Sequence, residues 1–288
     1  MSSARVADGI SFSGEDELAA YRRMLLIRRF EEKAGQLYAL EAFHGPCPLS
    51  IGQEGSIVGV LMAAEAGDPI ITAQRTHGHM LARGVDPRLI MAELLGREAG
   101  LSKGRGGSVN MYSPEHGFYG GHSMPGLCAS LGTGLAFAPR YNSTGPVCLC
   151  FFGEGAASRG RVLESYKIAA DWRLPIVFVI DNSVAAPGSV IVLGELPSAL
   201  ASSGARVAIP GEQVDGIDVR QARAAASRAI ARARRGEGPT ILEMLTFSYR
   251  GHEGLAAQPG RAEKRRDETD PVAKSRARIL ADGFATDA

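Results

Sequence analysis

An acidic side chain and a group of polar side chains follow two apolar runs of this sequence. Glu154 comes one glycine after the run 147–152, and an Asp-Asn-Ser triplet at 181–183 follows the run 176–180. Short, continuous apolar runs rich in strand-forming residues are typical of strands buried on both faces of a parallel sheet. Because the carboxyl ends of adjacent parallel strands meet at one edge, the oxygen atoms of both groups could hold Mg²⁺ against a diphosphate.

Two glycines, Gly153 and Gly155, flank the acidic residue Glu154. They allow the backbone to turn tightly and to approach a phosphate, while the carboxylate projects from the end of the strand. Ala156 then begins a small, polar segment that leads into a predicted helix. An acid between glycines can also be an ordinary solvated loop residue, but the pairing of Glu154 with Asn182 favours cofactor binding.

The elements that would position these side chains alternate between helix and strand, which predicts an α/β fold. We expect helices over about 15–39, from about 52 onward, and over 127–138 and 219–235. We expect strands over 69–72, 147–152, 176–180 and 240–246. Two longer segments, 97–125 and 251–269, are rich in Gly, Pro or charge, and we expect both to be loops.

Length and composition fit one α/β domain. The chain has 288 residues, of which 45% are hydrophobic, enough to bury a substantial core. We expect residues 1–15 to form a flexible N-terminus and residues 16–288 to form a single domain. The net charge of +1 gives no reason to expect nucleic acid or a membrane surface as partner. Because no signal peptide or membrane-spanning apolar run is evident, we expect a cytoplasmic protein.

Several sequence blocks, taken in order, resemble one enzyme family. They include the Gly-Glu-Gly-Ala-Ala-Ser block at 153–158, Gly-Gln-Glu at 52–54, Arg-Thr-His-Gly-His at 75–79, Gly-Arg-Gly-Gly-Ser at 104–108 and Tyr-Arg-Gly-His at 249–252. The sequence is similar to the alpha subunit of the decarboxylating component of 2-oxoacid dehydrogenases, the family of the pyruvate, branched-chain 2-oxoacid and acetoin dehydrogenase complexes. The resemblance covers roughly residues 18 to 285, and it implies a thiamine-diphosphate-binding fold with a mostly parallel sheet flanked by helices. Relative to the family, the C-terminus is shortened.

The resemblance implies a reaction and a set of partners. The family uses thiamine diphosphate and Mg²⁺ to decarboxylate a 2-oxoacid, and passes the acyl unit to the lipoyl group of a separate acyltransferase. A beta-type subunit completes the site in an α₂β₂ assembly, so we expect such a partner here. Two alternatives remain open: a carboligase half-enzyme that delivers a two-carbon unit to a ketone or aldehyde, and a non-catalytic paralogue that keeps the fold and the interface.

The same resemblance assigns roles to individual residues. It implies catalytic roles for His77 and His252. It implies cofactor binding by Gln74, Arg75, Ser123, Pro125, Gly153, Gly155, Ala156, Asp181, Arg250 and His252. It implies metal binding by Glu154, Asn182, Ser183 and the backbone carbonyl of Ala185. Arg75 suits a diphosphate because a guanidinium can bind it with two parallel hydrogen bonds. The alternative for Arg75 is an ordinary surface cation, and the alternative for His77 is a structural histidine.

Several of these positions depart from the family pattern. Ser183 stands where the family has a metal-binding Asn, and Gln74 stands where Tyr is usual. Pro125 has no N–H to offer the pyrimidine ring of the cofactor. Ala185 replaces a Tyr, but a backbone carbonyl survives that change. These departures fall in one pocket, which is why the non-catalytic alternative stays open.

Overall fold

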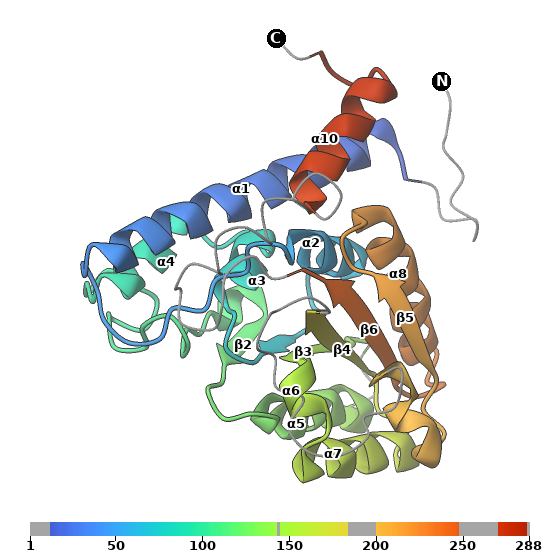
Figure 1. Cartoon of the computed structure of the whole chain (residues 1–288). Helices are drawn as coiled ribbons and strands as arrows, with labels where there is room; N and C mark the ends of the chain where they lie inside the picture. The colour runs from blue at the N-terminus through green and yellow to red at the C-terminus, as the bar shows by residue number, and fades with distance from the viewer. Residues whose placement is uncertain (1–11, 143–144, 184–199, 248–269, 287–288) are drawn as a thin grey trace.

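The computed structural model describes residues 12–142, 145–183, 200–247 and 270–286 of the chain. Within these ranges the chain forms a six-stranded sheet in the order β2-β1-β3-β4-β6-β5 (Figure 1). Every neighbouring pair of strands in this sheet is parallel. The strands are β1 (Ile70–Thr72), β2 (Phe118–Gly121), β3 (Cys148–Gly153), β4 (Ile176–Ser183), β5 (Gly211–Asp215) and β6 (Thr240–Thr246). The predicted α/β class and parallel sheet are confirmed.

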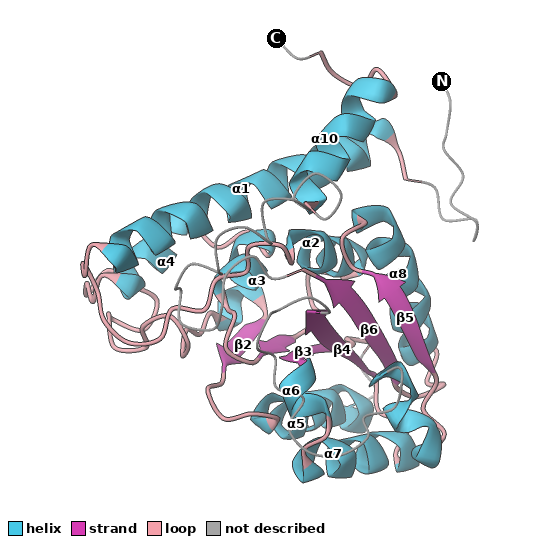
Figure 2. Ribbon diagram, viewed as in Figure 1, coloured by secondary structure: helices cyan, strands magenta, loops and turns pink. Residues whose placement is uncertain are grey.

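Helices cover both faces of the sheet (Figure 2). On one face, buried residues of the sheet belong to one hydrophobic cluster with residues of α1 (Gly14–Ala39), α2 (Glu54–Ala63), α3 (His77–Ala82), α4 (Pro87–Leu94) and α8 (Val219–Arg234). The other face packs against α5 (Leu127–Asn142), α6 (Glu154–Ala157), α7 (Gly160–Asp171) and the 3₁₀ helix η2 (Leu200–Val207). Val177 and Val179 of β4 face the first layer and Phe178 and Ile180 face the second, as a strand buried on both faces requires.

A glycine permits the close packing of α2 on α8. A Cβ atom added to Gly59 would lie 2.6 Å from the Cβ of Ala222 and 2.8 Å from the carbonyl oxygen of Val219. These distances are shorter than real Cβ contacts, so the two helices approach each other only because position 59 has no side chain. This contact holds α2 against α8, which packs on the sheet, and α2 carries Ser56 to the candidate site described below.

The folded part of the chain begins before residue 16, where we placed the start of the domain. Phe12 is buried, and the guanidinium groups of Arg220 and Arg223 lie over its ring at 5.7 and 5.1 Å. Ser13 caps α1 in a capping box with Asp16, in which each residue binds the backbone N–H of the other. The predicted flexible segment therefore does not extend to residues 12–15, because they pack and cap α1.

The last described helix, α10 (Pro271–Ala281), lies beside α1 (Figure 1). Asp270 caps α10 and accepts two hydrogen bonds from Arg28 of α1, at 2.7 and 3.0 Å. Arg28 also donates to Glu54 of α2 at 2.6 Å. All three charged groups are buried, so they join the first and last described helices through one network.

Two strands differ from the sequence-based prediction. β2, preceded by the 3₁₀ helix η1 (Pro114–His116), lies inside the segment 97–125 that we expected to be a loop. Its sequence, Phe-Tyr-Gly-Gly, is too short and too rich in glycine to give a strand pattern. β5 was also missed because it is an edge strand with a single apolar residue, Val214. Among the described helices, none is both long and apolar enough to span a membrane.

Candidate active site

Three strands end beside one another at the carboxyl edge of the sheet. In the register of β3 and β4, Gly153 lies opposite Asp181, so Glu154 follows β3 next to the end of β4. The N–H of Ala73, which follows β1, donates to the carbonyl oxygen of Phe151 at 3.0 Å. The segment from Gln74 onward therefore leaves the sheet beside the other two strand ends. This is the edge where we expected the cofactor residues to meet.

Charged groups from these strand ends act on one another. Burial raises the pKa of Asp181 to about 6; a hydrogen bond from Ser56 and the charge of Arg75 act against that increase, and the charge of Glu154 adds to it. Burial lowers the pKa of Arg75, while Asp181, Glu154 and Glu31 act to raise it. Arg75 Nε also donates to the carbonyl oxygen of Leu49 at 3.1 Å. The structure thus brings together three of the residues predicted from sequence: Arg75, Glu154 and Asp181.

The Gly-Glu-Gly turn leaves open space at the end of β3. Gly153 is the N-cap of the short helix α6, and Glu154 is its first residue and half-buried. A Cβ atom added to Gly155 would have no neighbour within 4 Å, whereas Ala156 is buried beneath the turn. A phosphate could therefore approach the backbone at Gly155. The oxygen atoms of Glu154 and of the buried Ser183 are hard donors of the kind that Mg²⁺ takes in proteins.

The side chains of Asn182 and Ser183 belong to opposite faces of β4 because successive residues of a strand alternate. Asn182 Nδ2 donates to Glu243 Oε1 of β6 at 2.7 Å, on the face covered by η2. Asp181, on the other face with Ser183, accepts from Ser56 Oγ of α2 at 2.9 Å. The structure therefore does not bring the amide of Asn182 to the face that Ser183 occupies, although we predicted both as metal ligands.

His77 is fully enclosed, with a partner on each ring nitrogen. Its Nδ1 lies 3.0 Å from Glu31 Oε2 of α1, and its Nε2 lies 2.9 Å from Ser108 Oγ. The Thr76 hydroxyl donates to the carbonyl oxygen of Ser108 at 2.6 Å. His77 is thus close to Arg75 in sequence and tied to the predicted long loop through Ser108. Sequence reasoning did not find Glu31 or the hydroxyl of Ser108.

His79 has a structural environment. Its Nδ1 donates to the carbonyl oxygen of Arg75 at 2.9 Å, and its ring packs on Phe151 with 4.4 Å between ring centroids. Burial lowers the pKa of His79 to about 4, so the ring is neutral at physiological pH. His79 therefore fixes the backbone that carries Arg75.

A second carboxylate missed by sequence reasoning organises the loop that carries Ser108. Glu93 of α4 is fully buried and accepts hydrogen bonds from four backbone N–H groups of this loop. The donors are Ser102 at 2.7 Å, Gly104 at 2.9 Å, Gly106 at 2.7 Å and Gly107 at 3.3 Å. The loop is folded around this one carboxylate, which replaces the backbone partners that a strand or helix would supply.

The segment 121–126 lies beside the end of β1. Gln74 Nε2 donates to the carbonyl oxygen of Ser123 at 3.3 Å, and the N–H of His122 donates to the carbonyl oxygen of Ala73 at 3.0 Å. The side chains of Ser123 and Pro125 are exposed, which leaves them accessible at this edge. The structure thus places Gln74 and Ser123 together, as the predicted cofactor site requires.

Three predicted site residues, Ala185, Arg250 and His252, lie outside the described residues. Within the described ranges, no group of three or more His, Cys, Asp or Glu side chains is placed to hold a metal ion. The predicted set does not need such a group because Glu154 is its single carboxylate. Its remaining oxygen donors would be a hydroxyl, a backbone carbonyl, the diphosphate and water.

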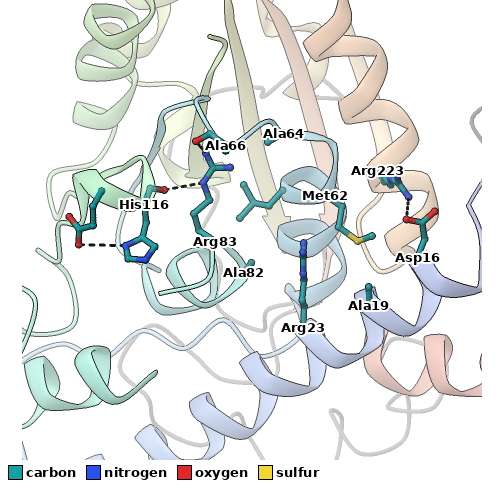
Figure 3. A pocket seen from close by; sticks show the side chains of 12 residues that line it. Asp16, Ala19, Arg23, Met62, Ala64, Ala66, Ala82, Arg83, His116 and Arg223 are labelled. Carbon is teal, nitrogen blue, oxygen red and sulfur yellow. Dashed lines mark hydrogen bonds and ion pairs between the residues drawn. The ribbon is translucent and has the colours of Figure 1, made fainter. Parts of the chain in front are cut away.

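A groove of about 510 Å³ lies elsewhere, among residues that precede β1 and residues of α1, α2, α3, η1 and α8 (Figure 3). Two of its cations already have partners. Arg83 donates to the carbonyl oxygens of Glu65 and Ala66 at 2.9 and 2.6 Å, and Arg223 pairs with Asp16 at 2.9 Å. The groove lies before β1, where the strand begins, so it is separate from the candidate site at the carboxyl edge.

Residues 22–288 match the family described as Dehydrogenase E1 component. Over 280 residues the chain is 50% identical to the pyruvate dehydrogenase E1 component subunit alpha of Rhizobium meliloti, with 96% of this chain and 80% of that protein covered. It is 48% identical to the corresponding subunit of Zymomonas mobilis, with 89% of this chain and 72% of that protein covered. It is 40% identical to the somatic, mitochondrial form of the pyruvate dehydrogenase E1 component subunit alpha of Bos taurus, with 90% of this chain and 65% of that protein covered.

These similarities extend over nearly the whole chain, and they confirm the family resemblance found in the sequence. They include the strand ends that carry Arg75, Glu154 and Asp181. The chain belongs to the dehydrogenase E1 component family, as an alpha-type subunit of the thiamine-diphosphate-dependent enzymes that decarboxylate 2-oxoacids and transfer the acyl unit.

Proposed function

We propose that this chain is the alpha subunit of an enzyme that decarboxylates pyruvate, with Mg²⁺ and the diphosphate of thiamine diphosphate held at the carboxyl edge of β1, β3 and β4. The observation that carries the cofactor site is the gathering of Arg75, Glu154 and Asp181 at that edge. The identity of 50% with a subunit described as pyruvate dehydrogenase supports pyruvate over other 2-oxoacids.

Each proposed contact uses a feature of the structure. The guanidinium of Arg75 would pair with phosphate oxygens, and the open backbone at Gly155 would let a phosphate approach. Glu154 and Ser183 would supply oxygen atoms to Mg²⁺, together with the backbone carbonyl of Ala185. When bound, thiamine diphosphate supplies the carbon nucleophile and the electron sink that decarboxylation needs.

The charges at the edge suit a divalent cation. Glu154 and Asp181 act on Arg75 and on each other, and Glu31 also acts on Arg75. Three carboxylates act on one guanidinium, so the edge keeps a net negative charge after Arg75 is counted and favours a further cation. Mg²⁺ would supply this charge and would be shared with the diphosphate. Arg250 and His252 stay in the proposal on the family resemblance, as residues at the phosphate end of the site.

We also propose a beta-type partner. An apolar surface patch on α5 and α7 is formed by Phe137, Tyr141 and Trp172, which are 42, 77 and 55% exposed. Their rings are in contact, with 5.9 Å between the centroids of Phe137 and Tyr141 and 5.4 Å between those of Phe137 and Trp172. Contiguous exposed aromatic groups of this kind are typical of protein interfaces. An assembly with a beta-type subunit, expected as α₂β₂, would cover them.

The test is reconstitution with a beta-type subunit. Thiamine diphosphate is titrated by calorimetry with Mg²⁺ and with EDTA, and release of carbon dioxide is then measured with pyruvate and with a branched-chain 2-oxoacid. We expect Mg²⁺-dependent cofactor binding, a higher kcat/KM for pyruvate, and acyl transfer to a lipoyl acceptor. Binding without turnover of pyruvate would overturn the substrate assignment, and products formed only with an aldehyde or ketone acceptor would indicate the carboligase alternative.

A further inference from the structure

We infer that Glu31 of α1 is a positioning residue of the active site. It is fully buried on α1, and its two oxygen atoms have different partners. Oε1 accepts from the backbone N–H of Ser50 at 3.0 Å, and Oε2 lies 3.0 Å from His77 Nδ1. Glu31 is 44 residues before Arg75 in the sequence, yet its charge acts on that guanidinium.

The contacts fix which nitrogen of His77 carries a proton. A carboxylate can only accept hydrogen bonds, so His77 Nδ1 must be the donor toward Glu31. In the neutral ring Nε2 then has a lone pair and accepts from the hydroxyl of Ser108, 2.9 Å away. The hydrogen bonds therefore run in one direction, from Ser108 to His77 to Glu31, and Glu31 sets that direction.

This chain of three residues connects the site to the loop around Glu93. Ser108 follows the four loop residues that donate to Glu93, and its carbonyl oxygen accepts from Thr76. Thr76 and His77 directly follow Arg75 in sequence. The orientation of His77 thus determines how the loop lies against the segment that carries the proposed diphosphate-binding guanidinium.

The cost of this arrangement argues that it has a function. Burying a carboxylate, an imidazole and a hydroxyl is less favourable than burying apolar side chains of the same volume. Such groups at buried positions therefore indicate that their placement serves the site. Every other core-facing position of α1 near Glu31 that is not an ion-pair partner carries an apolar or small side chain, as at Ile27, Phe30 and Ala34. A carboxylate at this position is therefore explained by the partner that it orients.

The test compares Glu31→Gln with Glu32→Gln in the reconstituted complex. A Gln amide can donate to Nδ1, which moves the ring proton to Nε2 and reverses the hydrogen bond to Ser108. The neighbouring Glu32 is the matched control because it pairs only with the exposed Arg29, at 3.0 Å, among the described residues. This inference rests on the proposed cofactor site, so affinity for thiamine diphosphate is measured by calorimetry with Mg²⁺ and without substrate.

We expect Glu31→Gln to weaken cofactor affinity and kcat by about ten- to a hundredfold, by analogy with the loss of a group that orients a metal-ligating histidine. The KM for the 2-oxoacid should change less than about twofold, and Glu32→Gln should behave as the original protein. Failure of the original protein to bind thiamine diphosphate would instead overturn the proposed function.

A double-mutant cycle shows whether Glu31 acts through His77. The variant that combines Glu31→Gln with His77→Gln should bind cofactor no more weakly than the weaker single variant, because both changes break one chain of hydrogen bonds. Ser108→Ala, which removes only a hydroxyl, repeats the cycle if the His77 variant does not fold. The inference would be overturned if the two changes weakened cofactor affinity independently, so that their fold-losses multiply in the double variant. Normal cofactor affinity in a folded Glu31→Gln variant would also overturn it.

Discussion

The carboxylate of Asp181, at the end of β4, accepts a hydrogen bond of 2.9 Å from the hydroxyl of Ser56 on α2. This contact joins the helix layer to the strand end at the site where the charges of Arg75 and Glu154 also act on Asp181. The hydrogen bond and the cation do not fully offset the burial of the carboxylate. The pKa of Asp181 is therefore raised to about 6.

The raised pKa of Asp181 predicts how stability depends on pH. Since the folded state holds the proton more tightly than the unfolded state, the protonated carboxyl favours folding below the ordinary pKa, and this contribution is lost as pH rises through about 6. A folded-state pKa that is higher by one corresponds to about 1.4 kcal/mol of stability once the pH is well below both pKa values, so the difference between pH 4 and pH 7.5 is about 2 kcal/mol. Asp181→Asn should therefore raise the melting temperature of the cofactor-free protein at pH 7.5 but not at pH 4.

The control for this prediction is Asp171→Asn, because Asp171 lies on the surface of α7 and pairs with Lys167. This variant should show no such pH-dependent gain. A gain for Asp181→Asn that is equal at both pH values would assign the effect to packing instead of titration.

A second prediction concerns the metal ligands. Glu154→Ala should abolish Mg²⁺-dependent binding of thiamine diphosphate and leave the fold intact, because Glu154 is half-buried at the start of α6 and supports no element of the core. Ser183→Asn should tighten binding by about 1 to 2 kcal/mol, since an amide carbonyl is a better neutral ligand than a hydroxyl. Calorimetry with Mg²⁺ and circular dichroism measure both effects. Unchanged affinity of the Glu154→Ala variant would remove Glu154 from the metal site.

A third prediction concerns the loop around Glu93. Glu93→Gln replaces an acceptor of four backbone hydrogen bonds with a group that has one carbonyl oxygen. The lost hydrogen bonds should cost about 3 kcal/mol and should free the loop. Trypsin should then cleave after Lys103 and Arg105 much faster than in the original protein. Glu98→Gln, at an exposed position a few residues away, is the matched control and should leave cleavage unchanged.

The sequence was sufficient to predict the edge of the sheet at which the site lies. β3 and β4 are continuous apolar runs, and the polar residues that follow them mark where each strand ends. The same alternation that identifies strands could have placed Asn182 and Ser183 on opposite faces. β2 could not be predicted because four residues with two glycines carry no pattern, and its place in the sheet depends on pairing with β1.

The residues that support the site were harder to find. Glu31 lies on a helix far from the strand ends in sequence, and Glu93 lies on another. Their one signal is position: each is a carboxylate at a core-facing position of an amphipathic helix, where an apolar side chain is usual. That pattern shows that a buried partner exists, but only tertiary structure identifies His77 or the N–H groups of a glycine-rich loop as the partner.

The last prediction concerns the aromatic patch on α5 and α7. Phe137 and Trp172 are exposed and in contact, so in the isolated subunit the apolar area of both rings faces water. Changing both residues to Lys should reduce the affinity of subunit assembly by at least about tenfold, because interface hot spots are enriched in Trp and cost about 2 kcal/mol or more when truncated. The fold should persist, since neither ring belongs to the core.

Leu40→Lys is the control for this change because Leu40 is 76% exposed at the end of α1, away from the patch. Light scattering of the chain with its beta-type partner, over a range of concentrations, measures the assembly. On dilution, the variant that combines Phe137→Lys with Trp172→Lys should lose the α₂β₂ mass at a higher protein concentration than the original protein does. The Leu40→Lys variant should behave as the original protein. Equal assembly of all three proteins would show that the patch lies outside the interface, and the beta-type subunit would then have to bind another surface of the chain.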